Sequence, residues 1–359
     1  MPDLLVAGAG MAGLVAAAEA RRLGAQALIL EKLDRPGGSM RLSSGVIWRH
    51  REFERFRSEC PDGDELLQRT LFERLDEDVR WLESLGAPVA ARETGNPLTT
   101  GVRFDPAGLT TALMAAADAA GSATVVFENA LRELPDRLPV ILATGGFAAD
   151  RGLLREHVTA EADHVFIRAV PGSTGDGLRL GLAAGGAAGS GLDQVYARAM
   201  AAPPARIPPD DFVRLAQLYA RHAEVTNERG ERYETATWSE VDVAQWAARQ
   251  PRARAWFRVP NAALGERVRD RAVGEMVDAA EAAGAPVRRE AEHVIVETIA
   301  GVTTTLGGLH IDERARVAPG VFACGADAGG IATGGYASGL AAALVFGRIA
   351  ARAAVGNDS

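Results

Sequence analysis

The chain has 359 residues, which suits two domains, because single domains usually contain about 100 to 200 residues. With 47% hydrophobic and 24% charged residues, it has the composition of a folded protein that can bury a large core. The net charge of -8 and the scatter of Lys and Arg among acids exclude the basic stripe of a nucleic-acid-binding protein. We therefore expect a small-molecule partner.

The N-terminal segment and the cysteine count indicate where the protein works. No positively charged region precedes the first apolar run, and glycines interrupt that run, so neither a signal peptide nor a membrane-spanning helix is expected. Cys60 and Cys324 are the only cysteines, which excludes a disulfide framework, and the six histidines show no metal-ligand spacing. We predict a cytoplasmic protein without a metal site, in which Cys324 is a buried thiol.

The first 31 residues predict a strand–helix–strand unit. Residues 4–7 are a short apolar run, and an Ala-rich helix is expected over residues 11–23, ending before Gly24. Residues 27–30 form a second apolar run that leads to Glu31. Short buried strands on either side of a helix are typical of a βαβ unit with parallel strands.

Three glycines occupy the turn between the first strand and the helix. Gly8 permits the tight turn, Gly10 lets backbone N–H groups approach a pyrophosphate, and Gly13 lets helix and strand pack closely. The helix N-terminus favours an anion, and Glu31 is placed to accept hydrogen bonds from ribose hydroxyls. A G-x-G-x-x-G pattern alone is a weak signal, but strand, helix and acid in register predict a dinucleotide site. The expected contacts also include Met11 and Ala12.

The alternation of helices and strands continues along the first half of the chain. Apolar spacing predicts helices over residues 72–85 and 108–120 and strands over residues 125–127 and 139–143. The Gly- and Ala-rich segment 175–191 also has helical spacing, so we expect a tightly packed helix there.

The composition changes near residue 193 and changes back near residue 305. Between these points the sequence predicts Arg-, Glu- and Trp-containing helices through residue 281 and a strand over residues 293–298. A glycine-rich signature then returns, and a last helix is expected over residues 336–353. We therefore predict a first domain of residues 1–192 and 305–359 and an inserted domain of residues 193–304.

Six motifs in a fixed order resemble the FAD-binding superfamily of fumarate reductases, succinate dehydrogenase flavoprotein subunits and 3-ketosteroid dehydrogenases. They are GAGMAG, EKLDRPGGS, LATGGF, STGDGLRLGLAAGG, TLGGLHIDERARV and ALVFGRIAAR, and together they span nearly the whole chain. The resemblance implies an α/β fold, with a Rossmann-like FAD-binding domain of the glutathione-reductase type and an inserted α+β cap domain. It also implies FAD rather than NAD, because Pro-Gly-Gly-Ser and Ser-Ser-Gly motifs follow the second strand.

The resemblance assigns further contacts to FAD. Ser338, Gly339 and Leu340 would turn their backbone toward the pyrimidine edge of the flavin, where donors stabilise the negative charge of the reduced ring. Gly325 and Asp327 would hold the ribityl chain. Because residues 38–48 lack the histidine that covalent relatives use, we expect non-covalent FAD. The other expected contacts are Lys32, Gly38, Ser39, Ser43, Ser44, Gly45, Ala130, Ala143, Thr144, Gly145, Gly146 and Asp176.

The substrate side departs from these relatives. An ungapped alignment places Glu240 where dicarboxylate reductases carry a proton-donating arginine, and Thr304 where they carry a histidine. The acid of a fumarate-type site is therefore absent. The catalytic candidates that remain are Tyr336, Arg198, Tyr196 and Thr304.

Each candidate has a chemical role and an ordinary alternative. The planar guanidinium of Arg198 can hold a substrate carboxylate, or it can be one of many solvated surface charges. Tyr336 can act as a general acid or polarise a carbonyl, or it can pack beside FAD as an ordinary aromatic. Glu240 is expected on the solvated face of a helix that also carries Asp242.

These features predict an FAD-dependent oxidoreductase that is not a standard fumarate reductase. The expected reaction moves a hydride between N5 of the flavin and a carbon next to a carbonyl or carboxylate, so that a carbon–carbon double bond forms or is reduced. No second dinucleotide motif is present, so oxygen, a quinone, a partner protein or a nicotinamide without its own domain would exchange the electrons. Two alternatives remain, namely an amine or alcohol oxidase and a flavin-binding subunit without catalysis.

Overall fold

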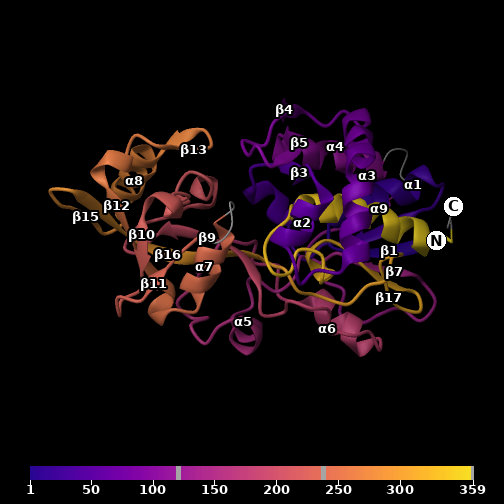
Figure 1. Ribbon diagram of the computed structural model, residues 1–359. Coiled ribbons are helices and arrows are strands. Elements are labelled where there is room, and N and C mark those ends of the chain that lie inside the picture. Colours follow the sequence, from indigo (N-terminus) through magenta and orange to yellow (C-terminus); the bar gives the residue numbers. More distant parts are fainter. Residues whose placement is uncertain (119–122, 236–239, 357–359) are drawn as a thin grey trace. The chain divides into compact units, whose positions relative to one another are not determined.

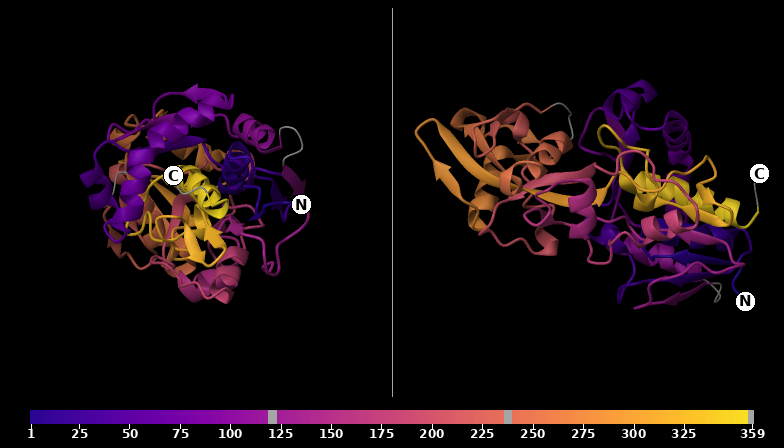
Figure 2. Two further views of the ribbon diagram at one scale, coloured as in Figure 1. Left: turned by 90° about the vertical axis from the view of Figure 1, so that its right-hand side faces the viewer. Right: turned by 90° about the horizontal axis from the view of Figure 1, so that it is seen from below.

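The computed structural model describes residues 1–118, 123–235 and 240–356 (Figure 1). The chain divides into two compact units, which we call the first unit and the second unit. The first unit consists of Met1–Asp150, Val170–Leu192 and Thr305–Ser359, and the second of Arg151–Ala169 and Asp193–Thr304. Both termini therefore belong to the first unit, as Figure 2 shows. Residues 151–169 group with the second unit, whereas the change of composition near residue 193 places them in the first domain.

A six-stranded sheet forms the centre of the first unit. Its strand order is β17-β18-β7-β1-β2-β6, and every neighbouring pair is parallel except β17 and β18. The central strands are short and apolar because a parallel sheet is covered on both faces. The sheet confirms the predicted βαβ unit and the α/β fold. The strands are β1 (Leu4–Ala7), β2 (Ala27–Leu30), β6 (Ala123–Val126), β7 (Val140–Leu142), β17 (Arg316–Ala318) and β18 (Val321–Ala323).

Three of the helices in the first unit match the predicted positions closely. These are α1 (Met11–Arg22), α4 (Pro106–Asp118) and α9 (Gly339–Ala354). The Ala-rich α1 is buried along its first ten residues and packs against α9, where a Cβ on Gly347 would lie 2.8 Å from the Ala12 carbonyl oxygen. Small residues on both helices therefore allow their backbones to approach closely.

Two helix predictions in the first unit need correction. Helix α3 (Glu65–Ser84) begins earlier than expected, because the Asp64 carboxylate accepts hydrogen bonds from the first backbone N–H groups and caps the helix. Helix α6 (Asp176–Ala183) ends well before the predicted residue 191. Gly185 has a φ of 87°, a left-handed conformation that ends helices, so the glycines after Ala183 interrupt the helix instead of packing it.

A buried ionic cluster joins α1, α3 and α9. Arg348, which is 4% exposed, pairs with Asp78 and with Glu19, the latter at 3.2 Å from Nε to Oε2. Arg352 pairs with Glu19 as well, at 2.7 Å. Buried charges are tolerated when they are paired, so these four side chains depend on one another.

A small antiparallel sheet completes the first unit. It consists of β3 (Val46–His50), β5 (Thr99–Phe104) and β4 (Val89–Ala91), with β5 in the middle. The helix α2 (Phe53–Glu59) follows β3 directly. Within the described part of the chain, no helix combines the length and the apolar character needed to cross a bilayer.

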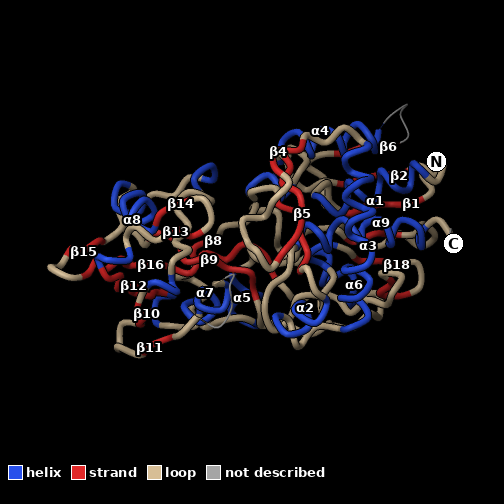
Figure 3. The backbone as a smooth tube through the Cα atoms, turned by 45° about the horizontal axis from the view of Figure 1, so that its top comes forward, coloured by secondary structure: helices blue, strands red, loops and turns tan. Residues whose placement is uncertain are grey.

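The second unit is built on a seven-stranded sheet with helices, as an α+β unit should be (Figure 3). The long strand β16 (His293–Thr305) pairs with four others, including the short β8 (Phe166–Ile167). This parallel pairing of β8 and β16 ties residues 151–169 to the second unit. The remaining strands of the sheet are β9 (Val195–Ala201), β10 (Glu224–Thr226), β11 (Arg232–Tyr233), β12 (Arg254–Pro260) and β15 (Val287–Arg289).

The prediction of helices through residue 281 is only partly right. The unit does contain α7 (Val241–Ala248) and α8 (Val273–Ala282), in addition to the short α5 (Arg151–His157). However, β12 lies between them, with Ala255, Phe257 and Val259 buried and polar or aromatic residues alternating with them. Its period-two pattern indicates a strand, whereas the sequence predicts helices throughout this region. A hairpin of β13 (Arg267–Val268) and β14 (Arg271–Ala272) follows.

Candidate functional site

The turn between β1 and α1 leaves space at the start of the helix. A Cβ on Gly8 would lie 2.3 Å from the Ala143 carbonyl oxygen, and one on Gly13 would lie 1.9 Å from the Gly8 carbonyl oxygen. A Cβ on Gly10 would meet no atom within 4 Å. Gly10 precedes α1, and no side chain caps this helix. The N-terminus of α1 therefore offers backbone N–H groups and room for an anion.

A second glycine loop lies beside this turn. The Gly37 N–H donates to the Ala9 carbonyl oxygen at 2.8 Å, and Gly37 has a φ of 102° that favours glycine. A Cβ on Gly38 would lie 3.2 Å from the Gly10 Cα. The loops that follow β1 and β2 are thus in direct contact, and Ser39 lies in the short 3-10 helix Gly38–Leu42 that begins there.

The carboxylate of Glu31 organises the end of β2. Glu31 is 7% exposed, and its two oxygens accept hydrogen bonds from the N–H groups of Ala9 at 2.7 Å and Leu33 at 2.8 Å. The Glu31 carbonyl oxygen accepts from the N–H of Asn129, the residue before Ala130. Each carboxylate oxygen keeps a further lone pair, so Glu31 can still accept from ribose hydroxyls.

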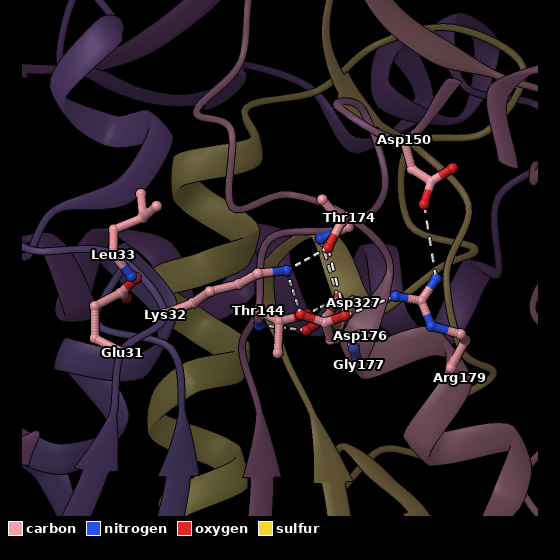
Figure 4. Close-up of polar contacts among 11 residues, drawn as sticks. Glu31, Lys32, Leu33, Thr144, Asp150, Thr174, Asp176, Gly177, Arg179 and Asp327 are labelled. Carbon is pink, nitrogen blue, oxygen red and sulfur yellow. Dashed lines mark hydrogen bonds and ion pairs between the residues drawn. The ribbon is translucent and has the colours of Figure 1, made fainter. Parts of the chain in front are cut away.

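The structure brings Lys32 and Asp176 together, as Figure 4 shows. The Lys32 ammonium lies 2.9 Å from an Asp176 carboxylate oxygen and donates to the Thr174 hydroxyl at 2.6 Å. Burial raises the pKa of Asp176, but hydrogen bonds from Lys32 and Arg179 outweigh it and hold the pKa below its usual value. This ion pair ties the end of β2 to the first residue of α6.

Asp327 holds the loop after β7 in place, a role that the sequence pattern did not indicate. It is 1% exposed, and its carboxylate accepts hydrogen bonds from the Thr144 N–H, the Thr144 hydroxyl at 3.1 Å and the Gly146 N–H at 3.0 Å (Figure 4). The Thr144 hydroxyl accepts in turn from the Gly177 N–H at 2.9 Å. Burial raises the pKa of Asp327, and these hydrogen bonds oppose that shift. The carboxylate thereby fixes the loop after β7, including Gly145.

Ser43, Ser44 and Gly45 form a tight turn before β3. The Ser43 hydroxyl donates to the Met40 carbonyl oxygen at 2.7 Å and accepts from the Gly45 N–H at 3.0 Å. A Cβ on Gly45 would lie 2.1 Å from the Phe104 carbonyl oxygen, so only glycine fits there. The Ser44 side chain is exposed, which leaves it available to a ligand.

The N-terminus of α9 presents the last candidate loop of the first unit. Ser338 caps the helix by accepting from the Ala341 N–H at 3.2 Å, and a Cβ on Gly339 would meet no atom within 4 Å. Tyr336 is half-buried, with its ring centroid 5.9 Å from that of Trp48 in an edge-on arrangement. Gly325 lies against the start of α1, because a Cβ there would be 2.9 Å from the Ala12 Cβ.

The second unit carries the remaining catalytic candidates. Tyr196 and Arg198 lie two residues apart on β9, and the Arg198 Nε donates to the Tyr196 hydroxyl at 2.9 Å. The guanidinium carbon of Arg198 lies 4.9 Å from the Tyr196 ring centroid, and Arg198 is 5% exposed. It is therefore not a solvated surface charge. Thr304 lies on β16, next to Thr303, whose hydroxyl accepts from the Arg168 guanidinium at 3.0 Å.

Positive charge surrounds the Tyr196 phenol. Burial raises its pKa, but the charges of Arg198, Arg168 and Arg269 outweigh burial and bring the pKa below its usual value. Arg168, which is 6% exposed, follows β8, and Arg269 lies at the tip of the β13–β14 hairpin. A phenol in this setting loses its proton more readily than an ordinary tyrosine does.

Glu240 contradicts the expectation of a solvated helix face. It is 5% exposed and precedes α7 with a φ of 57°, and it accepts a hydrogen bond from the Arg221 N–H at 3.4 Å. Burial raises the pKa of its carboxyl to about 7, although the backbone N–H groups of Arg221 and Ala220 and the charges of Arg198 and Arg221 oppose the shift. Helical periodicity located α7 but could not show that the residue before it turns inward.

The chain contains two cysteines, Cys60 and Cys324. Both thiols are buried, as predicted for Cys324, and burial raises the pKa of each, to about 12 for Cys60. Across residues 1–118, 123–235 and 240–356, no group of three or more His, Cys, Asp or Glu side chains is arranged to hold a metal ion.

The sequence matches the family described as FAD binding domain over residues 3–134 and 117–340. The chain belongs to this FAD-binding family. It is therefore a flavoprotein, which confirms the cofactor predicted from the glycine motifs. No curated protein sequence matches the chain significantly.

Solved structures of flavoproteins share the fold over the whole chain. The open conformation of a flavocytochrome c3 fumarate reductase is 21% identical, with a TM-score of 0.73, covering 99% of this chain and 78% of that chain. A 3-ketosteroid-Δ4-(5α)-dehydrogenase from Rhodococcus jostii RHA1 is 19% identical, with a TM-score of 0.70 and coverage of 99% and 96%. A 3-ketosteroid Δ1-dehydrogenase from Sterolibacterium denitrificans is 14% identical, with a TM-score of 0.73 and coverage of 99% and 100%. These likenesses confirm the predicted fold.

The flavoprotein contains polar residues that sequence reasoning missed. Arg168 and Arg269 were not candidates, because nothing in their local sequence separates them from the many other arginines of the chain. Their relation to Tyr196 depends on the pairing of β8 and β9 with β16 and on the β13–β14 hairpin. Only the tertiary structure supplies that information.

Proposed function

We propose that this flavoprotein is an oxidoreductase that forms or reduces a carbon–carbon double bond next to a carbonyl or carboxylate. A hydride moves between N5 of FAD and one carbon of this bond, and a proton leaves or joins its other carbon, which is bonded to the carbonyl or carboxylate. The observation that carries the proposal is the Tyr196 phenol, which accepts a hydrogen bond from the Arg198 guanidinium at 2.9 Å. The charges of nearby arginines also bring the pKa of this phenol below its usual value. A flavin and an ionisable phenol supply the two acceptors that a dehydrogenation needs, one for the hydride and one for the proton.

The glycine loops of the first unit fit FAD. The pyrophosphate would bind at the N-terminus of α1, where Gly10 leaves open space, and Glu31 would hold a ribose. The N-terminus of α9, where Gly339 also leaves open space, would face the flavin. FAD bound there supplies the acceptor or donor of the hydride.

Tyr196 would take the proton from the substrate carbon in the oxidative direction and return it in the reductive direction. Its partner Arg198 stabilises the phenolate through the 2.9 Å hydrogen bond and through its charge. Arg168 and Arg269 add further positive charge, so a substrate with a carboxylate would also gain attraction at this cluster.

Tyr336 would polarise the substrate carbonyl in this scheme. It lies three residues before Gly339, the first residue of α9, and its ring is supported by Trp48. A phenol hydrogen bond to a carbonyl oxygen makes the adjacent carbon more acidic, which assists proton removal by a base of moderate strength.

The substrate proposal favours ketones and enones over fumarate-like dicarboxylates. Glu240 occupies the position aligned with the proton-donating arginine of dicarboxylate reductases, so that acid is missing here. Two of the structurally similar proteins are 3-ketosteroid dehydrogenases in complex with steroid diones, which are compounds that carry carbonyl groups. These observations support, for this chain, a carbon acid activated by a carbonyl.

The test is anaerobic bleaching of the flavin absorbance by a panel of compounds. Saturated ketones should bleach the oxidised protein, and enones should restore the colour of the protein after chemical reduction. Bleaching by amines or alcohols alone would favour an oxidase of another kind. If no organic compound bleaches or recolours the flavin, the proposal is wrong and a non-catalytic flavin-binding role is favoured.

A further inference from the structure

Glu240 combines features that are unfavourable unless they serve a purpose. Its carboxyl is buried at 5% exposure, and its backbone has a φ of 57°, a left-handed conformation that side chains other than glycine rarely adopt. Among the residues that the structure describes, its Oε2 has no hydrogen-bond partner. A buried carboxylate oxygen in this state is unusual in proteins. Such residues are concentrated at functional sites.

The neighbours of Glu240 connect it to the proposed proton acceptor. Helix α7, which Glu240 precedes, packs against β9, and β9 carries Arg198 and Tyr196. The charges facing the Glu240 carboxyl are those of Arg198 from β9 and Arg221 from the turn Ala220–His222. The phenol of Tyr219, just before that turn, also lies within its electrostatic reach.

Arg198 is the shared neighbour of two acidic groups. It donates a hydrogen bond to the Tyr196 hydroxyl at 2.9 Å, and its charge also acts on the Glu240 carboxyl. When Glu240 is neutral, it does not offset the positive charge of Arg198, and that charge favours the Tyr196 phenolate. When Glu240 is ionised, it offsets part of that charge, so the phenolate is less favoured.

We propose that Glu240 is a positioning residue that controls the ionisation of Tyr196 through Arg198. The coupling itself is a property of the second unit and needs no substrate. Its consequence for catalysis rests on the proposed function, in which the Tyr196 phenolate accepts the proton from the substrate carbon. Glu240 itself touches neither the reacting carbon nor FAD in this proposal.

The pKa of Glu240 sets the pH range in which this coupling operates. Because burial raises its pKa to about 7, the carboxyl changes charge near neutral pH, whereas an exposed glutamate is ionised throughout this range. Asp242, two residues further along, accepts a hydrogen bond from the Tyr233 hydroxyl at 3.2 Å instead. It therefore provides a matched control on the same helix.

The test is a tyrosinate absorbance titration of the full-length, FAD-loaded protein without substrate. The chain has four tyrosines, and burial raises the pKa of Tyr219 strongly and that of Tyr233 to about 12, so Tyr196 ionises before these two. In each variant, subtracting the titration of the same protein that also carries Tyr196→Phe isolates its signal. In Glu240→Gln the Tyr196 midpoint should fall by about one pH unit, while Asp242→Asn should leave it unchanged.

A midpoint that stays the same in Glu240→Gln overturns the proposal. If that variant does not fold, Glu240→Gly removes the carboxyl and suits the left-handed backbone, and it should shift the midpoint in the same direction. The titration and the bleaching panel have separate outcomes. A failed bleaching panel contradicts the proposed function and leaves the titration informative, whereas an unshifted midpoint contradicts only the role of Glu240.

Discussion

The two units hold their acidic side chains in opposite ways. In the first unit the Glu31 and Asp327 carboxylates each accept hydrogen bonds from nearby backbone N–H groups, which fix the glycine loops. In the second unit the Glu240 carboxyl is buried with one oxygen lacking a partner among the described residues, near a phenol surrounded by arginines. The first arrangement gives a rigid frame, and the second gives groups whose charge can change. A cofactor needs the former, and proton transfer needs the latter.

The largest expected effect concerns the buried ionic cluster, which supports the first unit away from its glycine loops. Arg348→Met should lower the free energy of unfolding by about 3 to 5 kcal/mol, because it leaves Asp78 and Glu19 buried with less positive charge. Arg69→Met is the matched control, since Arg69 forms a half-exposed pair with Glu65 and its loss should change stability by less than about 1 kcal/mol. Chemical denaturation measures both. Equal losses in the two variants would contradict the account of the cluster.

The next prediction compares a glycine that the packing of the turn requires with a glycine that leaves room for a ligand. Gly13→Ala should cost about 3 kcal/mol of stability, because its Cβ would lie 1.9 Å from the Gly8 carbonyl oxygen. Gly10→Ala should leave the stability of the FAD-free protein nearly unchanged, since its Cβ meets no atom within 4 Å and its φ of -77° suits alanine. It should nevertheless weaken FAD binding at least about tenfold, measured by flavin fluorescence titration. Full FAD affinity in Gly10→Ala would mean that FAD does not occupy this space.

A smaller effect concerns the ionisation of Glu240 in the second unit. The pKa of Glu240 lies at about 7, above its ordinary value of 4.5, so its contribution to stability is fully present below pH 4.5 and is lost as the pH rises through 7. Glu240→Gln should therefore match the wild type at pH 4.5 and exceed its stability at pH 8 by at most about 3 kcal/mol. Denaturation at the two pH values measures this difference. A stability difference that does not depend on pH would show that Glu240 is ionised throughout.

The sequence predicted what is encoded locally. The β1–α1–β2 unit and its glycines followed from apolar periodicity and from the Gly8, Gly10 and Gly13 spacing, because a turn and a helix start depend on neighbouring residues. The strand β12 was missed, although its buried residues alternate with more exposed ones. The internal hydrogen bonds of Asp327 could not be predicted, since its partner Thr144 lies 183 residues away in the chain.

The residues missed in the second unit also depend on contacts between distant parts of the chain. Arg198 and Tyr196 could be named because they lie together on one strand, but Arg168 reaches this cluster only through the pairing of β8 with β16. The burial of Glu240 depends on how α7 packs against β9, and helical spacing does not give the direction of the residue that precedes a helix. Residues that act through charge are therefore harder to find in a sequence than residues that shape a backbone.

The most direct test of the proposed function compares anaerobic flavin bleaching by a saturated ketone in the wild type and in Tyr196→Phe. The account predicts that both proteins bind FAD fully and that the variant bleaches at least about 100-fold more slowly, because the proton acceptor is lost and the glycine loops are intact. Tyr233→Phe, which alters a tyrosine paired with Asp242, should bleach at the wild-type rate. Equal bleaching rates in the wild type and Tyr196→Phe would contradict the account.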